Sequence, residues 1–409
     1  MGRYLCLVLA LFVTGCASRQ PQHGGTGTSL NELVLSVKLA PEDVDARVRL
    51  GVAYARLGQF RQAVAQFDSA LKRAPEYPPA LYEKGQTLRT LGLHSEGKNL
   101  ILRAVRSPAG SELLARLARE LGRPFHIEQL TTGRYHHAFA SWFPDGQRLA
   151  LQSNRGGNWD LYVLNIRTGA LTRLTDHPGR DEAPFVSHDG SVLVFTSTRD
   201  SEPFADPRLQ QREIYLYALD KSLVKRLTTT HTDDFHPVLD PQGHTLFFVS
   251  AQSEKRRTLM ALDLTRRTTR PVTGPDVDSF GPAVSPDGAF LLFVQEENGR
   301  SLLCELELRT GRISILTDAL GTKASPCYSP DGKQIVFAAK DNGRYDLFLM
   351  ARDGTALLRL TDDEAIDGHP RFSPEGDRIV FHSDRTRVFQ LYLIDLTRPP
   401  AIEELVELF

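Results

Sequence analysis

The residues whose types and spacing could support chemistry recur at one position of a repeated pattern. Carboxylates that converge on one narrow opening concentrate a negative potential there. One interpretation is therefore an acidic funnel for a basic or N-terminal segment of a partner, or for a cation. The other is that each aspartate only bonds backbone N–H groups of a local turn. The candidates stand seven residues before the first residue of six similar turns, with two neighbours: His137, Asp181, Asp234, Ser279, Lys323 and Asp367, and Asp233 and Asp278 beside them.

The six turns end in Gly and follow one another at steps of 44, 53, 45, 44 and 44 residues. A period of this length is typical of a repeat architecture. Apolar, β-prone runs flank each turn, Pro presets φ at its start, and Gly supplies the positive φ that a hairpin needs. Each turn therefore predicts a β-hairpin. The turns are Pro144-Asp145-Gly146, His188-Asp189-Gly190, Pro241-Gln242-Gly243, Pro286-Asp287-Gly288, Pro330-Asp331-Gly332 and Pro374-Glu375-Gly376.

Two further apolar runs complete each period, which predicts the four-stranded blade of a β-propeller. The last run of each period ends in Thr. The first such ending precedes the first turn, and none follows the last turn. We therefore expect a six-bladed propeller over residues 123–398, closed because residues 127–131 complete the final blade. The endings are Thr131, Thr175, Thr228, Thr273, Thr317 and Thr361.

The turn Phe372-Ser373-Pro374-Glu375-Gly376, with the runs Ile379-Val380-Phe381 and Leu391-Tyr392-Leu393, resembles the Pro-Asp-Gly (PD40) repeats of the TolB-like propellers. TolB itself is the periplasmic partner of the Pal lipoprotein. The resemblance covers about two thirds of the chain and implies an interaction role in the cell envelope, by analogy with Tol–Pal. It also leaves a weakly bound cation open, with no other cofactor. The same repeats occur in prolyl-oligopeptidase-like enzymes.

The N-terminus has the pattern of an export signal. Arg3 precedes an apolar run at residues 5–13, too short to span a bilayer. The sequence Val13-Thr14-Gly15-Cys16 resembles a bacterial lipobox, which implies that residues 1–15 are removed and that Cys16 is acylated. Since Ala17 and Ser18 follow, the resemblance implies an outer-membrane lipoprotein on the periplasmic or surface face. The alternative is a cleaved signal with an incidental Cys; residues 16–29 are polar and predict a flexible tether.

Residues 30–122 carry a helical period and predict a tetratricopeptide domain. Leu50, Gly51, Ala63 and Phe67 match one repeat, and Gly85 stands thirty-four residues after Gly51. Gly97 replaces the expected Ala, at about 1 kcal/mol of helix propensity. Fifteen Lys and Arg stand against ten Asp and Glu in residues 30–123, which fits either a solvated face or a basic groove for an acidic peptide.

Signals for catalysis and for metal binding are weak. His136, His231, His236 and His369 lie in or near the same loops as His137, but no pair has a tight ligand spacing. There is no Gly-x-Ser-x-Gly elbow and no phosphate loop. The chain has a net charge of −1 and a pI near 6.9, which gives no reason to expect a nucleic-acid partner. We therefore predict no enzyme activity and no bound metal.

Three smaller features complete the expectations. The longest step between turns holds a connection with Phe204, either a partner-contacting loop or a tolerated insertion. Cys304 and Cys327 fit buried small hydrophobic residues better than a disulfide, since they fall on strands of different type. Residues 399–409 predict a C-terminal tail with a short amphipathic helix that includes Ile402, Leu405, Val406 and Phe409.

Together these patterns predict a lipid-anchored, non-enzymatic scaffold or adaptor of the cell envelope. Its partners would be envelope proteins or peptide segments, held by the helical groove and the channel mouth, with membrane contact through the N-terminal lipid. The alternatives are a glycan- or peptidoglycan-binding lipoprotein and an enzyme that uses channel residues. If the acidic funnel binds the partner directly, Asn at Asp181, Asp234 and Asp367 should weaken binding and leave the melting temperature unchanged.

Overall fold

The computed structural model describes residues 29–121, 124–201, 210–253, 256–341 and 343–406. The chain divides into two compact units between Ser107 and Pro108. The helix at Ser111–Glu120 therefore belongs to the second unit, whereas the sequence predicts the boundary at residue 122. The following paragraphs take each unit by itself.

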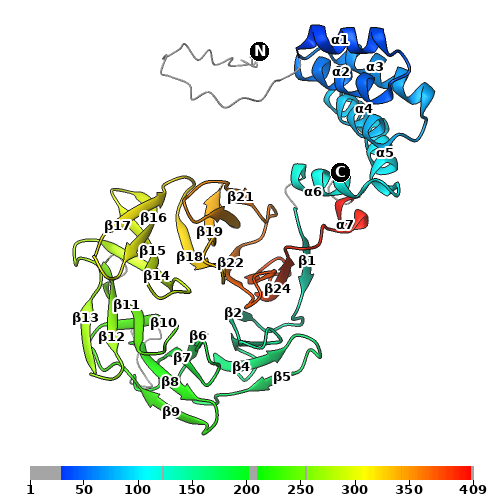
Figure 1. Ribbon diagram of the computed structural model, residues 1–409. Coiled ribbons are helices and arrows are strands. Elements are labelled where there is room, and N and C mark those ends of the chain that lie inside the picture. Colours follow the sequence, from blue (N-terminus) through cyan, green and yellow to red (C-terminus); the bar gives the residue numbers. More distant parts are fainter. Residues whose placement is uncertain (1–28, 122–123, 202–209, 254–255, 342, 407–409) are drawn as a thin grey trace, which may run out of the picture. The chain divides into compact units, whose positions relative to one another are not determined.

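The first unit consists of helices that pack as hairpins (Figure 1). Its second and third helices form one hairpin and its fourth and fifth form another, as the tetratricopeptide pattern predicts. Ser29 caps the first helix: its Oγ accepts the N–H of Glu32 at 3.3 Å, and its own N–H donates to the Glu32 carboxylate at 2.6 Å. The helices are α1 (Leu30–Leu39), α2 (Val44–Arg56), α3 (Phe60–Arg73), α4 (Pro78–Thr90) and α5 (His94–Arg106).

Glycines set the helix spacing in both hairpins. A Cβ on Gly51 would lie 2.5 Å from the Phe67 ring, and one on Gly97 would lie 2.5 Å from the backbone oxygen of Gly85. The interpretation of Gly97 as a tolerated replacement for Ala is therefore wrong. Gly85 on α4 and Gly97 on α5 let the backbones of these two helices approach more closely than any side chain allows.

We predict that Gly97→Ala lowers the stability of the helical unit, although Ala is the better helix former by about 1 kcal/mol. The added methyl group forces α4 and α5 apart, and overpacking of this kind costs about 1–3 kcal/mol. Asn99→Ala is the matched control, because Asn99 is exposed on the same helix. Thermal unfolding followed by helical circular dichroism should show a lower midpoint for Gly97→Ala only. A higher midpoint for both variants would contradict the close-packing argument.

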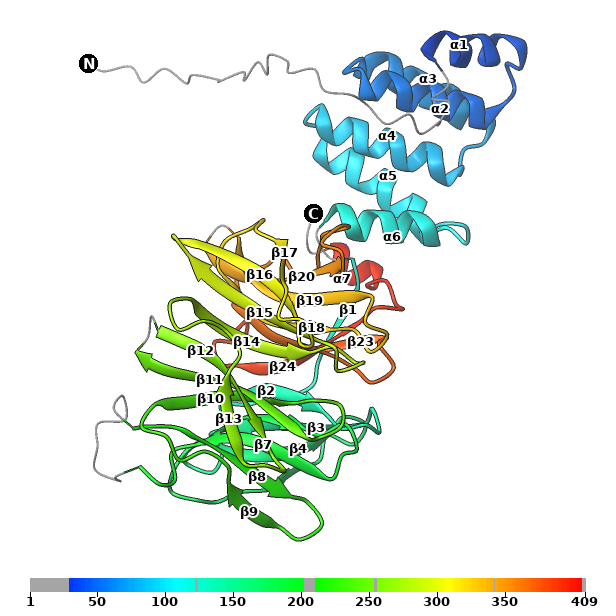
Figure 2. The same cartoon turned by 60° about the vertical axis from the view of Figure 1, so that its left-hand side comes forward.

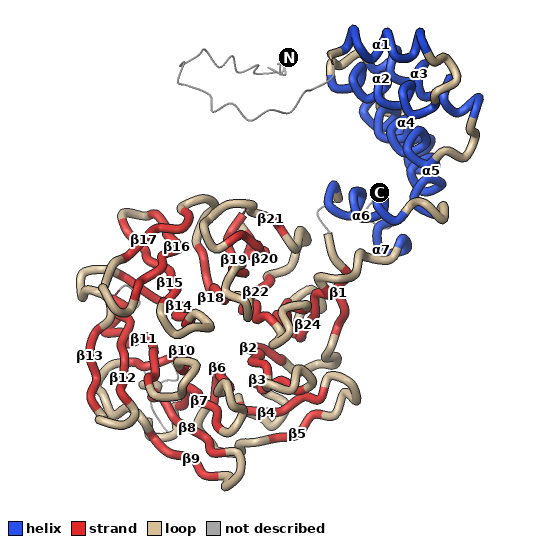
Figure 3. Tube along the Cα trace, in the orientation of Figure 1, coloured by secondary structure: helices blue, strands red, loops and turns tan. Residues whose placement is uncertain are grey.

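The described part of the second unit contains six four-stranded sheets arranged as blades around a ring (Figures 1 and 3). This confirms the predicted six-bladed propeller. Each blade runs antiparallel from its innermost strand outward. The first three blades are β2 (His137–Trp142), β3 (Arg148–Ser153), β4 (Asp160–Asn165) and β5 (Leu171–Arg173); β6 (Asp181–Val186), β7 (Val192–Ser197), β8 (Glu213–Ala218) and β9 (Leu223–Arg226); and β10 (Asp233–Leu239), β11 (Thr245–Ser253), β12 (Arg256–Asp263) and β13 (Thr268–Pro271).

The remaining blades repeat this plan, and two helices flank the ring in sequence. They are β14 (Asp278–Val284), β15 (Phe290–Glu297), β16 (Arg300–Glu307) and β17 (Ile313–Thr317); β18 (Lys323–Tyr328), β19 (Gln334–Asp341), β20 (Arg344–Ala351) and β21 (Leu358–Arg359); and β22 (Asp367–Phe372), β23 (Arg378–Ser383), β24 (Gln390–Asp395) and β1 (His126–Gln129). The helices are α6 (Ser111–Glu120) and α7 (Ile402–Val406). Helix α7 buries Leu405, as expected for the tail, whereas Phe409 lies outside the described residues.

The two ends of the propeller close the ring by sharing its last blade, as predicted. Strand β1 pairs antiparallel with β24, with His126 opposite Asp395 and Gln129 opposite Tyr392 (Figure 2). The Thr131 Oγ accepts the N–H of Leu391 at 2.9 Å across the closure. The blade of β2–β5 makes the same bond internally, from the Leu161 N–H to the Thr175 Oγ at 3.0 Å. The repeated Thr is therefore a clamp between the third and fourth strands of a blade.

The core of the ring lies between neighbouring blades. One hydrophobic cluster combines Leu149 and Leu151 of β3 with Val380 of β23 and Leu391 of β24. Comparable clusters join each following pair of blades around the ring. No single blade has a core of its own, so all blades must assemble around one axis to bury their apolar faces.

Candidate functional site

The structure places the six predicted positions at the start of the innermost strands and buries all of their side chains. Five of them are 0 % exposed, and His137 is 4 % exposed. The carboxylates therefore do not form an open funnel, because each is enclosed by its own and the neighbouring blade. A direct contact between these side chains and a partner stays a prediction, and their positions make an indirect role the better account.

Two of the buried aspartates are paired with arginines. The Asp181 carboxylate accepts from Arg199 at 2.7 and 2.9 Å and from the Ser197 hydroxyl at 2.6 Å. Asp367 accepts two bonds of 3.1 Å from Arg385. In both pairs the second strand ends in Ser, and the arginine lies two residues later, in a Ser-x-Arg sequence. In each pair one guanidinium nitrogen donates to both carboxylate oxygens, which ties the start of the first strand to the end of the second.

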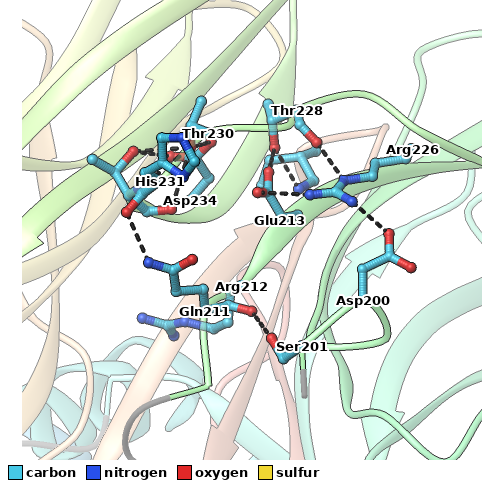
Figure 4. Close-up of polar contacts among 12 residues, drawn as sticks. Asp200, Ser201, Gln211, Arg212, Glu213, Arg226, Thr228, Thr230, His231 and Asp234 are labelled. Atoms are coloured by element: carbon cyan, nitrogen blue, oxygen red, sulfur yellow. Dashed lines mark hydrogen bonds and ion pairs between the residues drawn. The ribbon is translucent and has the colours of Figure 1, made fainter. Parts of the chain in front are cut away.

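Asp234 occupies the same position without an arginine. Its carboxylate accepts from the hydroxyls of Ser250 at 2.7 Å, Thr230 at 2.9 Å and Thr232 at 3.2 Å. Figure 4 labels Asp234 and Thr230 of this group. Burial raises the pKa of Asp234 to about 6, and the hydroxyl bonds only partly oppose this effect. The adjacent Asp233 pairs instead with Arg212, as Asp278 in the next blade pairs with Arg257 at 2.6 Å.

The remaining predicted positions carry other residue types. His137 replaces the acid in the first blade, and burial followed by the nearby Arg155 lowers its pKa to about 4. Lys323 donates from Nζ to the backbone oxygens of Ser301 at 2.7 Å and Gly321 at 3.4 Å. Burial lowers the pKa of Lys323. One repeat position thus holds acids, a base, a neutral imidazole and the hydroxyl of Ser279. The acids and the base bond to neighbouring groups, whereas the buried His137 Nδ1 and Ser279 Oγ have no hydrogen-bond partner among the described residues.

A second set of buried ion pairs fastens the outer strands. Glu213, at the start of β8, accepts from Arg226 at 3.0 Å and from Thr228 at 2.5 Å, and Arg226 also contacts Asp200 (Figure 4). Asp160 pairs in the same way with Arg173 at 2.8 Å. These bonds hold the blades and leave little free charge for a ligand.

Sequence reasoning missed a ring of strained residues in the middle of the channel. Each innermost strand has a bulge of two residues without a ladder partner, and the first of them has φ between 49° and 65°. A left-handed backbone costs about 1–2 kcal/mol at a residue other than Gly. The pairs are Phe139-Ala140, Ala183-Pro184, His236-Pro237, Gly281-Pro282, Ser325-Pro326 and His369-Pro370.

Aromatic rings from this bulge ring close around the axis. The Phe139 ring lies 4.6 Å from His369, 5.1 Å from His382 and 5.8 Å from His236, measured between ring centroids. Burial lowers the pKa of His382 to about 4 and that of His236 to about 3, and it lowers the pKa of His369 well below its usual value. All three imidazoles are therefore neutral at physiological pH.

Beyond the bulge ring the channel widens into a cavity of about 430 Å³. Its wall comes from the second halves of all six innermost strands, with Trp142, Phe185 and Phe372 among its apolar side chains. Its rim consists of the first residues of the six turns. The turns that predicted the fold thus surround the open end of the channel, opposite the end where the candidates were expected. The rim residues are Pro144, His188, Pro241, Pro286, Pro330 and Pro374.

Arg371 stands at the inner end of this cavity. It lines both the large cavity and a second one of about 20 Å³ at the bulge ring. Its guanidinium donates to the backbone oxygens of Pro370 at 2.9 Å and Ser325 at 3.4 Å, and to Nε2 of His369 at 3.0 Å. The signal was available in the sequence: the residue three before each turn is Ser, Phe, Val, Ala or Cys in the other blades and Arg only here.

The other predicted site residues fall into two groups. Cys16 and Phe204 lie outside the described residues. Cys304 and Cys327 are free thiols. Cys304 is buried in a hydrophobic cluster, as expected for a small apolar residue, and Cys327 lies in the cavity wall.

Two features are absent from the residues that the structure describes. No group of three or more His, Cys, Asp and Glu side chains is arranged as a metal site. In the same part of the chain, no helix combines the length and the apolar character needed to cross a bilayer.

Comparison with known families supports the propeller and the helical repeat. The TolB beta propeller domain matches residues 124–308 and 279–401, and a tetratricopeptide repeat matches residues 44–87. An uncharacterised protein of Agrobacterium fabrum is 32 % identical over 113 residues, which are 28 % of this chain and 36 % of that protein. The Tol-Pal system protein TolB of Francisella tularensis is 33 % identical over 91 residues, which are 22 % of this chain and 19 % of TolB. The matched segments thus cover only 36 % of the first relative's length and 19 % of the second's.

Solved structures share the fold. A putative TolB from Agrobacterium tumefaciens superimposes with a TM-score of 0.52 at 17 % identity, over 66 % of this chain and 96 % of that one. A gluconolactonase from Xanthomonas campestris gives a TM-score of 0.51 at 15 % identity, over 69 % of this chain and 92 % of that one. At such identities the likeness concerns the fold alone. This fold is shared by a protein named as an enzyme, the gluconolactonase, and by one that is not, the putative TolB.

We predict opposite effects on stability for two aspartates at the same repeat position. Asp181→Asn should destabilise the propeller by about 3 kcal/mol, because Arg199 loses its carboxylate inside the protein. This replaces the unchanged melting temperature expected for an open funnel. Asp234→Asn should be neutral or stabilising at pH 7, because no cation depends on it. Denaturant unfolding of both variants measures the difference. Equal effects would contradict the assignment of Asp181 as the ion-paired and Asp234 as the uncompensated acid.

Asp234 should also give a distinct pH dependence. Burial raises its pKa in the folded state from the ordinary value of 3.8 to about 6, so the folded state binds the proton more tightly. The wild type should therefore lose up to about 3 kcal/mol relative to Asp234→Asn as the pH rises from 4 to 7. Unfolding free energies of both proteins across this range test the sign. A difference that stays flat with pH would show that Asp234 is ionised throughout.

Proposed function

The chain belongs to the TolB β-propeller domain family, and from this premise we propose that it is a non-enzymatic interaction protein of the cell envelope. Its relatives include a Tol-Pal system protein, and its helical repeat is of a class that binds peptides and helices. The role is that of a scaffold or adaptor attached to the outer membrane by lipid at Cys16, with the folded part on the periplasmic or surface face.

The central cavity is the observation that carries the proposal. A volume of about 430 Å³ falls in the range of pockets that hold small ligands or short segments of another chain. Prolines dominate its rim, and rigid rim residues lose little entropy when a partner docks. The polar groups at the other end of the channel are used within the blades, so the cavity is the better candidate for recognition.

Absence of catalysis is part of the same proposal. Asp181, Asp367 and Glu213 form ion pairs with arginines that bridge strands, and the channel imidazoles are neutral and packed against Phe139. Among the described residues, the ion-paired carboxylates and arginines do not line the large cavity. The chemistry that the cavity offers is binding.

We predict that filling the cavity abolishes capture of the envelope partner. In a cross-linking pull-down from native membranes, Ala283→Phe should lose the partner that the wild type captures, because Ala283 lines the cavity. Ala289→Phe is the matched control, since Ala289 is exposed in the same hairpin. Capture that survives Ala283→Phe but fails without residues 30–107 would move recognition to the helical unit. Retention on purified peptidoglycan with no captured protein would favour a cell-wall ligand instead.

Lipid attachment has a separate test. Cys16→Ala should leave the protein without acyl chains, and cell fractionation should then find it in the soluble envelope fraction and no longer in the membrane pellet. Metabolic labelling with a fatty acid should mark the wild type only. Ser18→Ala, two residues away, serves as the control. Membrane retention of Cys16→Ala would contradict an anchor at this residue.

A further inference from the structure

Arg371 differs from the other enclosed arginines of the propeller in its partners. Arg199 pairs with Asp181, Arg385 with Asp367, and Arg352 with Glu305 at 2.8 Å. Arg371 is partly buried, and the partners described for it are the neutral ones given above: Ser325, Pro370 and His369. Among the described residues, no carboxylate forms an ion pair with it. A guanidinium keeps its charge in proteins, so this cation has no counter-charge of its own.

The groups described around Arg371 supply no opposite charge. Burial lowers the pKa of its guanidinium, which still keeps its charge in proteins. The nearest imidazoles, His236, His369 and His382, are neutral, as shown above. Among the described residues that line the large cavity, Asp240 is the only carboxylate. Asp240 belongs to the rim and accepts the N–H of His244 in its own turn at 2.7 Å. The inner end of the cavity is therefore positive, and its rim carries the only acid.

A charge removed from water without an ion partner costs several kcal/mol. An apolar residue would fit among Trp142, Phe185 and Phe372 without that cost, and the equivalent positions in the other blades carry small or apolar side chains. His369 adds a second unsatisfied group: its Nε2 accepts from Arg371, and its buried Nδ1 has no hydrogen-bond partner. The Arg371 guanidinium is thus a donor at the inner end of an apolar cavity, an arrangement suited to an anion, while His369 lines the small cavity beside it.

We propose that the central cavity binds a carboxylate attached to an apolar body, with the carboxylate at Arg371 and the apolar part against the aromatic wall. The carboxylate could belong to the C-terminus of a peptide or to a free organic acid, since both present the same group. Either would supply the missing counter-charge, and the planar guanidinium can donate two parallel bonds to it. The site extends the proposed function, because it names the chemistry that the cavity recognises.

Calorimetry on the purified full-length chain tests the proposal with defined probes. They are N-acetyl-Ala-Val-Leu with a free C-terminal carboxylate and the same peptide as its amide, and phenylbutyrate and its amide. We expect at least one acid to bind about ten-fold or more tightly than its amide, because charge-assisted bonds exceed neutral ones by this order. Preference for the peptide acid would identify a chain terminus as the ligand, and equal binding of both acids would identify a free acid as sufficient.

Variants of Arg371 connect the preference to this residue. Arg371→Gln should bring the ratio of acid to amide affinity close to one, and Arg371→Lys should keep part of it. Arg309→Gln, at an arginine with 86 % side-chain exposure, should leave it unchanged. The melting temperature of Arg371→Gln should be equal or higher, because an uncompensated charge has been removed. A lower melting temperature with an unaltered preference would show that Arg371 only supports the fold.

Alkylation of the Cys327 thiol measures ligand binding independently of calorimetry. It lies in the cavity wall, so a bound acid should slow its alkylation, which mass spectrometry of the Cys327 peptide measures. The amide should give no protection. Equal affinities for acid and amide, or no binding of any probe at about 1 mM, would overturn the proposal. Because these assays need no envelope partner, their failure would differ from failure of the membrane pull-down.

Discussion

The convergence of six innermost strands on one axis is the constraint on which the rest of the second unit depends. Each of these strands bulges at the same place, with a left-handed residue followed by Pro in five of six cases. Pro has no N–H to lose from the ladder, so it suits a position without a partner. The bulges place the Phe139 and His369 rings on the axis and leave a cavity beyond them.

Buried charge is treated in two ways around this ring. In the walls, Asp181 and Arg199 or Glu213 and Arg226 pair within a blade, and each pair replaces side-chain freedom with a fixed connection between strands. At the end of the cavity, Arg371 meets only neutral groups. In the first arrangement each charge lies beside an opposite charge, whereas in the second no carboxylate is described beside the Arg371 guanidinium. The partners of an arginine therefore distinguish its role: an arginine paired with a carboxylate supports the fold, and one that meets only neutral groups can recognise a ligand.

The fold could be predicted from the sequence almost in full, and the site could not. Pro-Asp-Gly spacing and the terminal Thr of each blade are local signals, so they revealed the six blades and the closure by β1. Burial of Asp181 and Asp234 is a property of the assembled ring, which spacing does not report. Spacing also does not say which end of the channel is open. Arg371 was visible as an exception in its repeat column, but its meaning needed the partners that only the fold supplies.

The shared blade has a consequence for the order in which the chain is made. Strand β1 is the first strand to emerge during synthesis, yet its partner β24 is the last. The bond from Leu391 to Thr131 joins residues 260 positions apart. Closure at so large a separation is slow, because the intervening chain must be ordered first. The segment at residues 126–131 therefore cannot pair with β24 until the whole ring has been synthesised, and a chain truncated before β24 leaves β1 without this partner.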